Sequence, residues 1–258
     1  HVVWAERCGV LLKGTEEDGK CQASGGREIK GGKGMKALFV NGSPRKNWNT
    51  HKMLESAMEG AREAGAEAEL VHLYDAVFKG CVSCFACKVK NSRTNGLCAF
   101  RDPLTPTLEK ARDADVIVIG SPVYFHCSTA STRAFLERLV FPLLVYGIEE
   151  RRVLKKTVPT AMIYTMNCPE GLVERFHYPT LLGANTDALR LTFGYSETLC
   201  AYDTYQFSDY SRYEVTLFNE KDKARQREEQ FPKDLQSARE LGKRLVEKAA
   251  SRAEPDAE

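Results

Sequence analysis

The sequence predicts an α/β fold in which five parallel strands, in the spatial order 2-1-3-4-5, form a doubly wound sheet with helices on both faces. Short apolar runs rich in β-branched residues alternate with segments of helical periodicity along residues 35–250. Such runs are typical of parallel strands that are buried on both faces, and the alternation is typical of doubly wound sheets. The length of 258 residues, with 43% hydrophobic and 28% charged residues, is ordinary for a globular protein.

The first part of this pattern is two strands around a helix. Residues 37–40 form an apolar run that ends at the turn-forming residues Asn41-Gly42-Ser43-Pro44, so we expect the first strand there. Residues 50–64 carry apolar side chains at helical spacing, which predicts the first helix. Residues 66–73 are expected to form the second strand, and a cysteine-rich loop at 80–100 follows it.

The remaining elements continue the alternation. Val116–Ile119 is the most apolar of the expected strands, and it ends at Gly120-Ser121-Pro122. Residues 211–230 hold five basic and five acidic side chains without apolar periodicity, so we expect a solvated connection there. The other expected elements are helices at 104–112, 129–145, 180–191 and 232–250, the last of them amphipathic, and strands at 158–165 and 198–205.

The two ends of the chain differ from this domain, which we place at residues 35–252. Residues 1–34 contain 8 of the 19 glycines and show no sustained helix or strand period. We interpret them as a flexible or artificially added leader. The alternative is an arm that covers a partner subunit, favoured by the apolar residues Val2, Val3, Trp4 and Val10–Leu12. Residues 253–258 are expected to be a disordered tail.

Charge and cysteine placement exclude several classes of protein. The formal net charge of +2 gives no basic surface of the kind that nucleic-acid binding needs, and no apolar run approaches the ~18 residues of a membrane span. The nine cysteines are not spread as in a small disulfide scaffold, and no signal-peptide pattern opens the sequence. We therefore expect a protein of the cytoplasm.

Ligands of such sheets bind beyond the carboxyl ends of strands one and three, which directs attention to residues 42–50 and 121–129. The first loop has hydroxyl and amide side chains and two cations, Arg45 and Lys46, just before a helix start, where backbone N–H groups favour an anion. The second loop has a proline and two aromatic residues, which provide a flat apolar wall for a planar ring. The simpler explanation is a Ser or Asn helix cap with a turn proline for the first loop, and a hydrophobic turn for the second.

Together these motifs resemble a known family. Gly42-Ser43-Pro44-Arg45 with Asn49-Thr50, and Ser121-Pro122-Val123-Tyr124, are similar to the NAD(P)H-dependent FMN reductase branch of the flavodoxin-like superfamily. When Cys81-x-x-Cys84-x-x-Cys87 and Cys98 are added, the chain resembles the iron–sulfur flavoproteins over about residues 35–250. The departure is the ten-residue gap before Cys98, which is usually shorter in that family.

The resemblance implies a flavodoxin-like fold that binds FMN. The residues that would hold the FMN phosphate are Ser43, Arg45, Asn47, Asn49 and Thr50, with Lys46 in the same loop. The residues that would line the isoalloxazine ring are Pro122, Val123, Tyr124, Phe125 and His126, with Thr165, Met166 and Asn167 approaching from the other side. Because the flavin carries the chemistry, we assign no catalytic acid or base.

The cysteine cluster is the candidate metal site. Three cysteines at a spacing of two, Cys81, Cys84 and Cys87, are typical of iron–sulfur ligands, and Cys98 would supply the fourth thiolate of a [4Fe–4S] cluster. Structural zinc more often uses two separated Cys-x-x-Cys pairs, so zinc is the weaker metal interpretation. Reduced structural or redox-active thiols are the alternative without a metal.

These expectations combine into an FMN-dependent oxidoreductase. It would take electrons from NAD(P)H or a ferredoxin-like donor and pass them to a small-molecule acceptor or a ferredoxin-like protein, directly or through the cluster. The alternatives are a non-enzymatic electron carrier, a cluster-free NAD(P)H:quinone or FMN reductase, and a flavin-free interaction protein. The helix at 129–145 and the apolar run at 141–146 would bury either core or the interface of a homo-oligomer.

Overall fold

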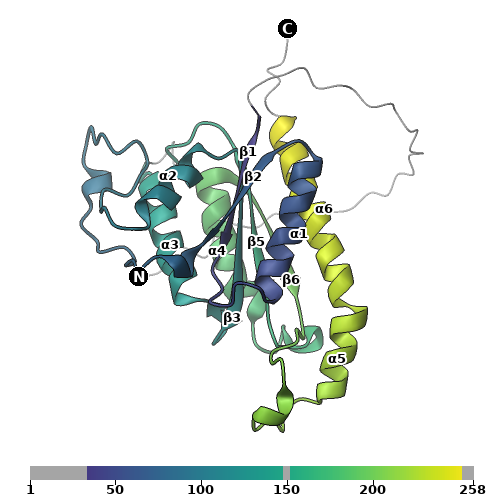
Figure 1. The fold of residues 1–258 in the computed structure, drawn as a ribbon. Coiled ribbons are helices and arrows are strands. Elements are labelled where there is room, and N and C mark those ends of the chain that lie inside the picture. The colour runs from purple at the N-terminus through teal and green to yellow at the C-terminus, as the bar shows by residue number, and fades with distance from the viewer. Residues whose placement is uncertain (1–33, 148–151, 252–258) are drawn as a thin grey trace, which may run out of the picture. The chain divides into compact units, whose positions relative to one another are not determined.

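The structure is a computed structural model that describes residues 34–147 and 152–251. Figure 1 shows one sheet with helices packed around it. The expectations for residues 1–33 and for the tail at 253–258 fall on residues outside these ranges. Within the described part, no helix has both the length and the apolar character to cross a membrane.

The predicted parallel α/β sheet is confirmed, with one strand more than expected. Its order is β2-β1-β3-β5-β6, and the two-residue β4 pairs antiparallel with the end of β3. The five parallel strands thus follow the predicted order, and the predicted count of five misses β4. The strands are β1 (Lys36–Asn41), β2 (Glu67–His72), β3 (Val116–Tyr124), β4 (Cys127–Ser128), β5 (Val158–Thr165) and β6 (Gly194–Ala201).

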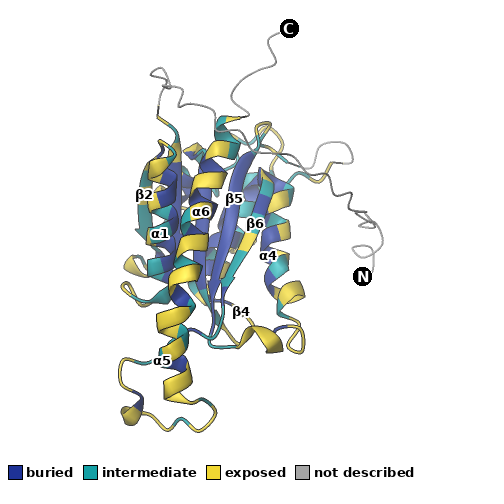
Figure 2. Cartoon of the chain, turned by 90° about the vertical axis from the view of Figure 1, so that its right-hand side faces the viewer, coloured by how far each residue is buried: buried dark blue, intermediate teal, exposed yellow. Residues whose placement is uncertain are grey.

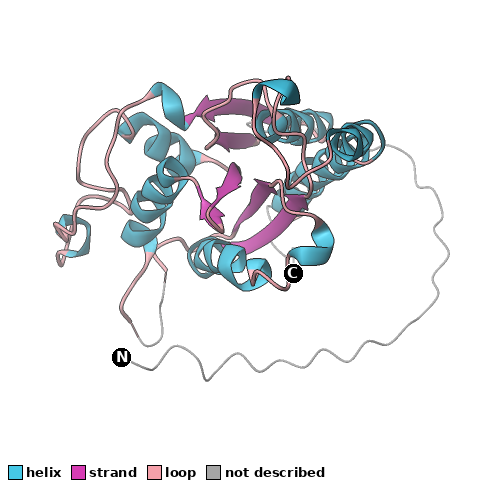
Figure 3. Ribbon diagram, turned by 90° about the horizontal axis from the view of Figure 1, so that it is seen from below, coloured by secondary structure: helices cyan, strands magenta, loops and turns pink. Residues whose placement is uncertain are grey.

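Helices cover both faces of this sheet, as Figure 3 shows from below. The α-helices are α1 (Asn49–Glu63), α2 (Thr105–Asp113), α3 (Ala130–Val140), α4 (Tyr178–Phe193), α5 (Glu220–Glu229) and α6 (Phe231–Ala250). The short 3-10 helices are η1 (Leu73–Asp75), η2 (Ala86–Lys88), η3 (Phe141–Leu143), η4 (Glu170–Leu172) and η5 (Tyr210–Arg212).

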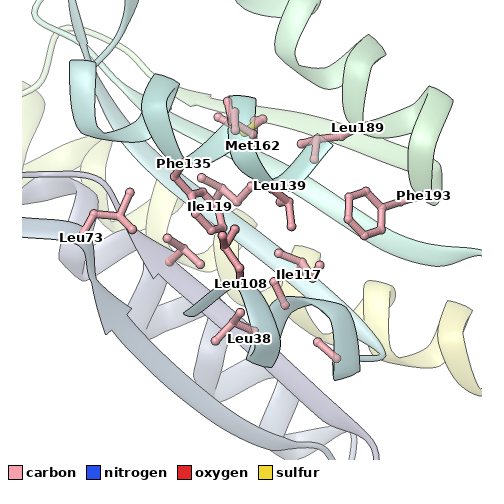
Figure 4. Packing of buried hydrophobic residues seen from close by; sticks show 14 of the residues in the cluster. Leu38, Leu73, Leu108, Ile117, Ile119, Phe135, Leu139, Met162, Leu189 and Phe193 are labelled. Carbon is pink, nitrogen blue, oxygen red and sulfur yellow. The ribbon is translucent and has the colours of Figure 1, made fainter. Parts of the chain in front are cut away.

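Alternating side chains of the central strands fill two separate cores. Ile117 and Ile119 of β3 point to the face covered by α2, α3 and α4, where they pack with the residues drawn in Figure 4. Val116 and Val118 point to the opposite face, which α1 and α6 cover. Figure 2 shows the strands β5 and β6 between helices whose outer surfaces are exposed. Burial on both faces explains why these strands read as continuous apolar runs.

Helices α1 and α6 lie side by side because glycine removes a side chain at each contact. A Cβ at Gly60 of α1 would overlap the carbonyl oxygen of Arg239, and a Cβ at Gly242 of α6 would overlap that of Ala57. The backbones therefore approach more closely than any larger residue would allow. This contact fixes the position of α1, whose first turn forms one wall of the site described below.

Helix α3, strand β6 and the segment at 211–230 differ from the sequence prediction, as does the end of β3 described below. Helix α3 ends at Val140 and not at residue 145, because Pro142 lacks an N–H and its ring clashes with the carbonyl one turn earlier. Strand β6 runs from 194 to 201 and not from 198 to 205, and its last residue pairs with Thr165 at the end of β5. The expected connection at 211–230 contains α5, which begins after Asn219 caps the Lys221 N–H.

Candidate functional site

The carboxyl ends of the parallel strands meet at a pocket of about 160 Å³. Ten of the fourteen residues predicted to contact a flavin line it, and they come from the segments after β1, at the end of β3 and after β5. These ten are Ser43, Arg45, Asn49, Thr50, Pro122, Val123, Tyr124, Thr165, Met166 and Asn167. The pocket also takes in Trp48, Thr204, Tyr205 and Gln206, which the sequence analysis missed.

The loop after β1 is held by its own polar groups. The Ser43 N–H donates to Asn41 Oδ1 over 2.8 Å, and the Arg45 N–H donates to Ser43 Oγ over 3.1 Å. Helix α1 then begins after Trp48, which occupies the N-cap position. Its side chain makes no capping hydrogen bond to the first turn of the helix. The first-turn N–H groups and the positive end of the helix dipole therefore face the pocket and favour an anion.

The segment after β6 closes one side of the pocket. The carbonyl oxygen of Tyr205 accepts from Trp48 Nε1 at 3.1 Å and from Asn49 Nδ2 at 2.8 Å. The carbonyl oxygen of Gln206 accepts from Arg45 Nη1 at 2.5 Å. These residues were missed because the predicted strand ran to residue 205. The rule that strand ends gather ligands, applied at residue 201, points to them.

The end of β3 is a strand where the sequence analysis expected a loop. Ser121 and Pro122 continue β3 beside β5, and Val123 and Tyr124 pair with β4. The tip of this hairpin, Phe125 and His126, has positive φ at both residues. These two lie outside the pocket lining. Phe125 is 98% exposed, and the His126 ring packs 5.1 Å from that of Tyr178. Tyr124 stays at the pocket, where burial raises the pKa of its hydroxyl.

Hydroxyl groups tie the three pocket segments together. Thr129 Oγ1 donates to the Gly42 carbonyl over 2.7 Å, which links the start of α3 to the first loop. Thr50 Oγ1 and Thr165 Oγ1 lie 2.7 Å apart and are buried, so α1 is fixed to the end of β5. The pocket walls are therefore connected by hydrogen bonds before any ligand binds, which is the condition for a rigid binding site.

Two further predicted residues lie at the outer side of the first loop. Lys46 forms an ion pair with Asp75, and both side chains are about half exposed, at 54% and 52%. Asn47 is exposed as well. Neither residue lines the pocket. Of the two loop cations, Arg45 and Lys46, only Arg45 lies at the pocket.

Asn167 of the pocket lining carries a buried acceptor. Asn167 Oδ1 is buried and has no hydrogen-bond partner among the described residues. The Asn167 backbone is fixed, because its carbonyl accepts from Lys223 Nζ at 3.0 Å. A buried acceptor without a partner costs free energy unless a ligand donor reaches it. The pocket lining thus includes both the start of a helix, which favours an anion, and an amide oxygen without a donor, and the two together fit a phosphorylated ligand with a ring N–H.

The four clustered cysteines converge on a second, much smaller cavity of about 10 Å³. It is lined by Cys81, Cys84, Cys87 and Cys98 together with the fully buried Arg138. Burial raises the pKa of the Cys87 thiol. Among the described residues, no three or more His, Cys, Asp or Glu side chains are arranged as a metal-binding group. The four thiols are suitable metal ligands, but the described residues do not hold them in an arrangement that would bind a metal ion.

Comparison with known proteins identifies a family and a fold. Residues 35–171 match the family of NADPH-dependent FMN reductases. An iron–sulfur flavoprotein of Archaeoglobus fulgidus is 40% identical over 104 residues, which are 40% of this chain and 48% of that protein. One of Methanosarcina thermophila is 34% identical over 106 residues, 41% of this chain and 53% of that protein. The chain spans about half the length of these curated relatives.

Solved structures share the fold at low sequence identity. An NAD(P)H:quinone oxidoreductase from Methanothermobacter marburgensis has a TM-score of 0.58 and 17% identity, covering 83% of this chain and 100% of that one. An azoreductase from Bacillus anthracis has a TM-score of 0.53 and 15% identity, covering 81% and 99%. These likenesses concern the arrangement of helices and strands.

Proposed function

Because the chain belongs to the NADPH-dependent FMN reductase family of oxidoreductases, we propose that it binds FMN in the pocket at the carboxyl ends of β1, β3 and β5. Bound FMN supplies hydride and electron transfer, and the protein supplies binding, orientation and exclusion of water. The observation that carries the proposal is the convergence of ten predicted flavin-contacting residues on that one pocket.

The first loop and α1 would bind the phosphate. The uncapped first turn of α1 offers backbone N–H donors, and Asn49 and Thr50 lie within it. Arg45 adds a positive charge at the edge of the pocket, where its guanidinium also lies 5.4 Å from the centre of the Trp48 ring. One Arg45 N–H already donates to the carbonyl of Gln206, so the other guanidinium N–H groups would be the donors to the phosphate.

The ends of β3 and β5 would hold the ring. Pro122 and Val123 would provide an apolar wall, and Thr165–Asn167 lie beside it, because Pro122 is paired with Thr165 in the sheet. The unpartnered Asn167 Oδ1 would accept a hydrogen bond from a ring N–H, which removes the cost of burying that oxygen. Tyr124, which is 46% exposed, stands at the opening through which an electron donor and acceptor would approach.

We propose NAD(P)H as the electron donor and a small molecule or a ferredoxin-like protein as the acceptor. The test is steady-state oxidation of NADPH and NADH by FMN-loaded protein, with a quinone, free FMN and a ferredoxin as separate acceptors. Turnover with any of them supports the reductase. Tight FMN binding without turnover by any acceptor would instead indicate a non-enzymatic electron carrier.

A second candidate function is electron transfer through a [4Fe–4S] cluster. It is favoured by one observation, namely that Cys81, Cys84, Cys87 and Cys98 line a single cavity although ten residues separate the last two. Four thiolates are the donor set that such a cluster requires. We propose these residues as its ligands, held by the segment between β2 and α2.

Iron and labile-sulfide analysis of anaerobically purified protein tests this second function. About four irons per chain are expected, with loss of iron in Cys98→Ser. The matched control is Cys127→Ser, because Cys127 is an exposed thiol that does not line the cysteine cavity. Flavin without iron would refute the cluster and leave the FMN proposal intact, and zinc without sulfide would show a structural metal instead.

A further inference from the structure

Two stacked histidines lie against the first loop, outside the pocket. His51 of α1 and His72 at the end of β2 have ring centres 5.3 Å apart with an interplanar angle of 26°. His72 Nδ1 lies 3.2 Å from Nδ2 of Asn41, the last residue of β1. Asn41 is fully buried, and its Oδ1 accepts the Ser43 N–H over 2.8 Å. One amide side chain thus joins His72 to the start of the loop.

The direction of these hydrogen bonds follows from the donors present. A backbone N–H can only donate, so the Asn41 atom that faces Ser43 must be the oxygen. The Asn41 amino group therefore faces His72, and an amino group can only donate. His72 Nδ1 must accept, which requires a neutral ring whose proton is on Nε2.

We propose that His72 is a positioning residue whose neutral ring fixes Asn41 and, through it, the start of the FMN phosphate loop, so that protonation of His72 weakens FMN binding. This inference rests on the proposed function, because the ligand whose affinity changes is FMN. His72 does not line the pocket, so it acts through Asn41 and Ser43 and not by touching the ligand.

The charged groups around His72 come from every element packed against it. His51 and Glu55 face it from α1, Lys46 from the loop after β1, and Asp75 from η1. Glu55 Oε1 lies 3.0 Å from His51 Nε2, and Asp75 forms an ion pair with Lys46. Burial lowers the pKa of His72, and the charges of His51 and Lys46 act in the same direction against Asp75 and Glu55.

Protonation places two donors opposite each other. Both ring nitrogens of a charged histidine carry protons, so Nδ1–H would face the Asn41 amino group. If the Asn41 amide turns, the buried Ser43 N–H loses its acceptor. If the His72 ring moves away, Asn41 loses the group that orients it. Either change loosens the loop, with an expected loss of roughly tenfold in FMN affinity, the effect of one unmade hydrogen bond at a buried group.

The test compares FMN dissociation constants of wild type and His72→Asn at about pH 7.5 and about pH 4.5, the lower value being well below the usual histidine pKa because burial lowers the pKa of His72. The Asn side chain places its oxygen where Nδ1 lies, so it still accepts from Asn41 but does not titrate. The FMN phosphate itself titrates near pH 6, and this contribution is the same for both proteins. We expect equal affinity at the higher pH and a wild-type deficit of roughly tenfold at the lower pH.

Two more variants identify the responsible group. His51→Gln keeps a donor for Glu55 and should retain the acid-induced loss of affinity, because the loop link runs through His72. His72→Leu removes the acceptor and should bind FMN weakly at both pH values. Parallel pH profiles for wild type and His72→Asn would overturn the proposal, as would loss of the response in His51→Gln alone.

A measurement without FMN separates this inference from the proposed function. Nitrogen-15 NMR of the imidazole rings in wild-type protein should show His72 protonated at Nε2 and not at Nδ1 at about pH 7.5. An Nδ1–H form of His72 would refute the inference. If the protein bound no FMN at either pH, the proposed function would fail, while this spectrum would still decide whether His72 orients Asn41.

Discussion

Replacing Lys223 with methionine tests how the segment after β6 is held against the pocket. Lys223 lies in α5, its side chain is only 3% exposed, and it forms an ion pair with Asp203. The same ammonium group donates to the Asn167 carbonyl over 3.0 Å and lies 4.8 Å from the centre of the Phe218 ring. Methionine keeps the apolar stem and removes the charge, so the change is confined to these polar contacts.

The expected loss of stability follows from the unpaired Asp203 carboxylate that the substitution leaves. Breaking a fully buried ion pair typically costs 3–5 kcal/mol, because the remaining charge is unpaired. The Asp203 side chain is 25% exposed, so water compensates part of that loss. We therefore expect Lys223→Met to lower the free energy of unfolding by about 2–3 kcal/mol. FMN should also bind more weakly, because Asn167 and residues 203–206 lose their common anchor.

Guanidinium denaturation and FMN titration of the two proteins measure these effects. The control is Arg225→Met, which removes an ion pair on the same helix whose side chains are 65% and 58% exposed. The control should change the unfolding free energy by less than about 0.5 kcal/mol and leave FMN affinity unaltered. Equal effects of the two substitutions would show that the contacts of Lys223 add no more to stability or to FMN affinity than an exposed ion pair does.

Three further predictions concern the loop, the pH dependence of stability and the ring end of the pocket. Gly42→Ala should lower the free energy of unfolding by about 1–3 kcal/mol, because the added Cβ would overlap Thr132 Oγ1. An unchanged melting temperature would contradict this packing. Burial raises the pKa of Asp102, but hydrogen bonds and the charge of Arg138 lower it overall. The stability from Asp102 is thus present above its unfolded pKa of about 3.9 and lost as pH falls further. Denaturation curves should show Asp102→Asn about 3 kcal/mol less stable at neutral pH, converging with wild type in acid, whereas a constant difference would refute the assignment. Asn167→Leu should weaken FMN binding roughly tenfold without affecting binding of a simple phosphate, and equal FMN affinity would exclude Asn167 as a ring contact.

The strands were predictable because burial on both faces leaves a continuous apolar signal. The four apolar residues Val116–Ile119 are sufficient to predict a buried strand, whatever strands lie beside it. Strand β5 was predicted at its observed bounds of 158 and 165. Topology directed attention to the segments at 42–50 and 121–129, and the family resemblance added 165–167 and the individual residues, ten of which line the pocket.

The elements and pocket residues that the sequence did not predict depend on contacts that leave no periodic apolar pattern. Helix α5 has a single buried residue, Lys223, so its sequence shows no apolar period. Tyr205 and Gln206 contribute backbone carbonyls to the pocket, and a carbonyl leaves no mark in the sequence. The extension of β3 depends on pairing with β5 at Ser121 and Pro122 and with the two-residue β4 at Val123 and Tyr124. Local pattern does not encode any of these contacts.

Titration of the flavin-free protein with FMN and with riboflavin, followed by flavin fluorescence, tests the central claim most directly. The pocket predicts one FMN per chain and riboflavin binding at least roughly tenfold weaker, because riboflavin lacks the phosphate that the first turn of α1 would bind. Equal affinity for the two flavins, or no saturable binding of FMN, would contradict the assignment of this pocket.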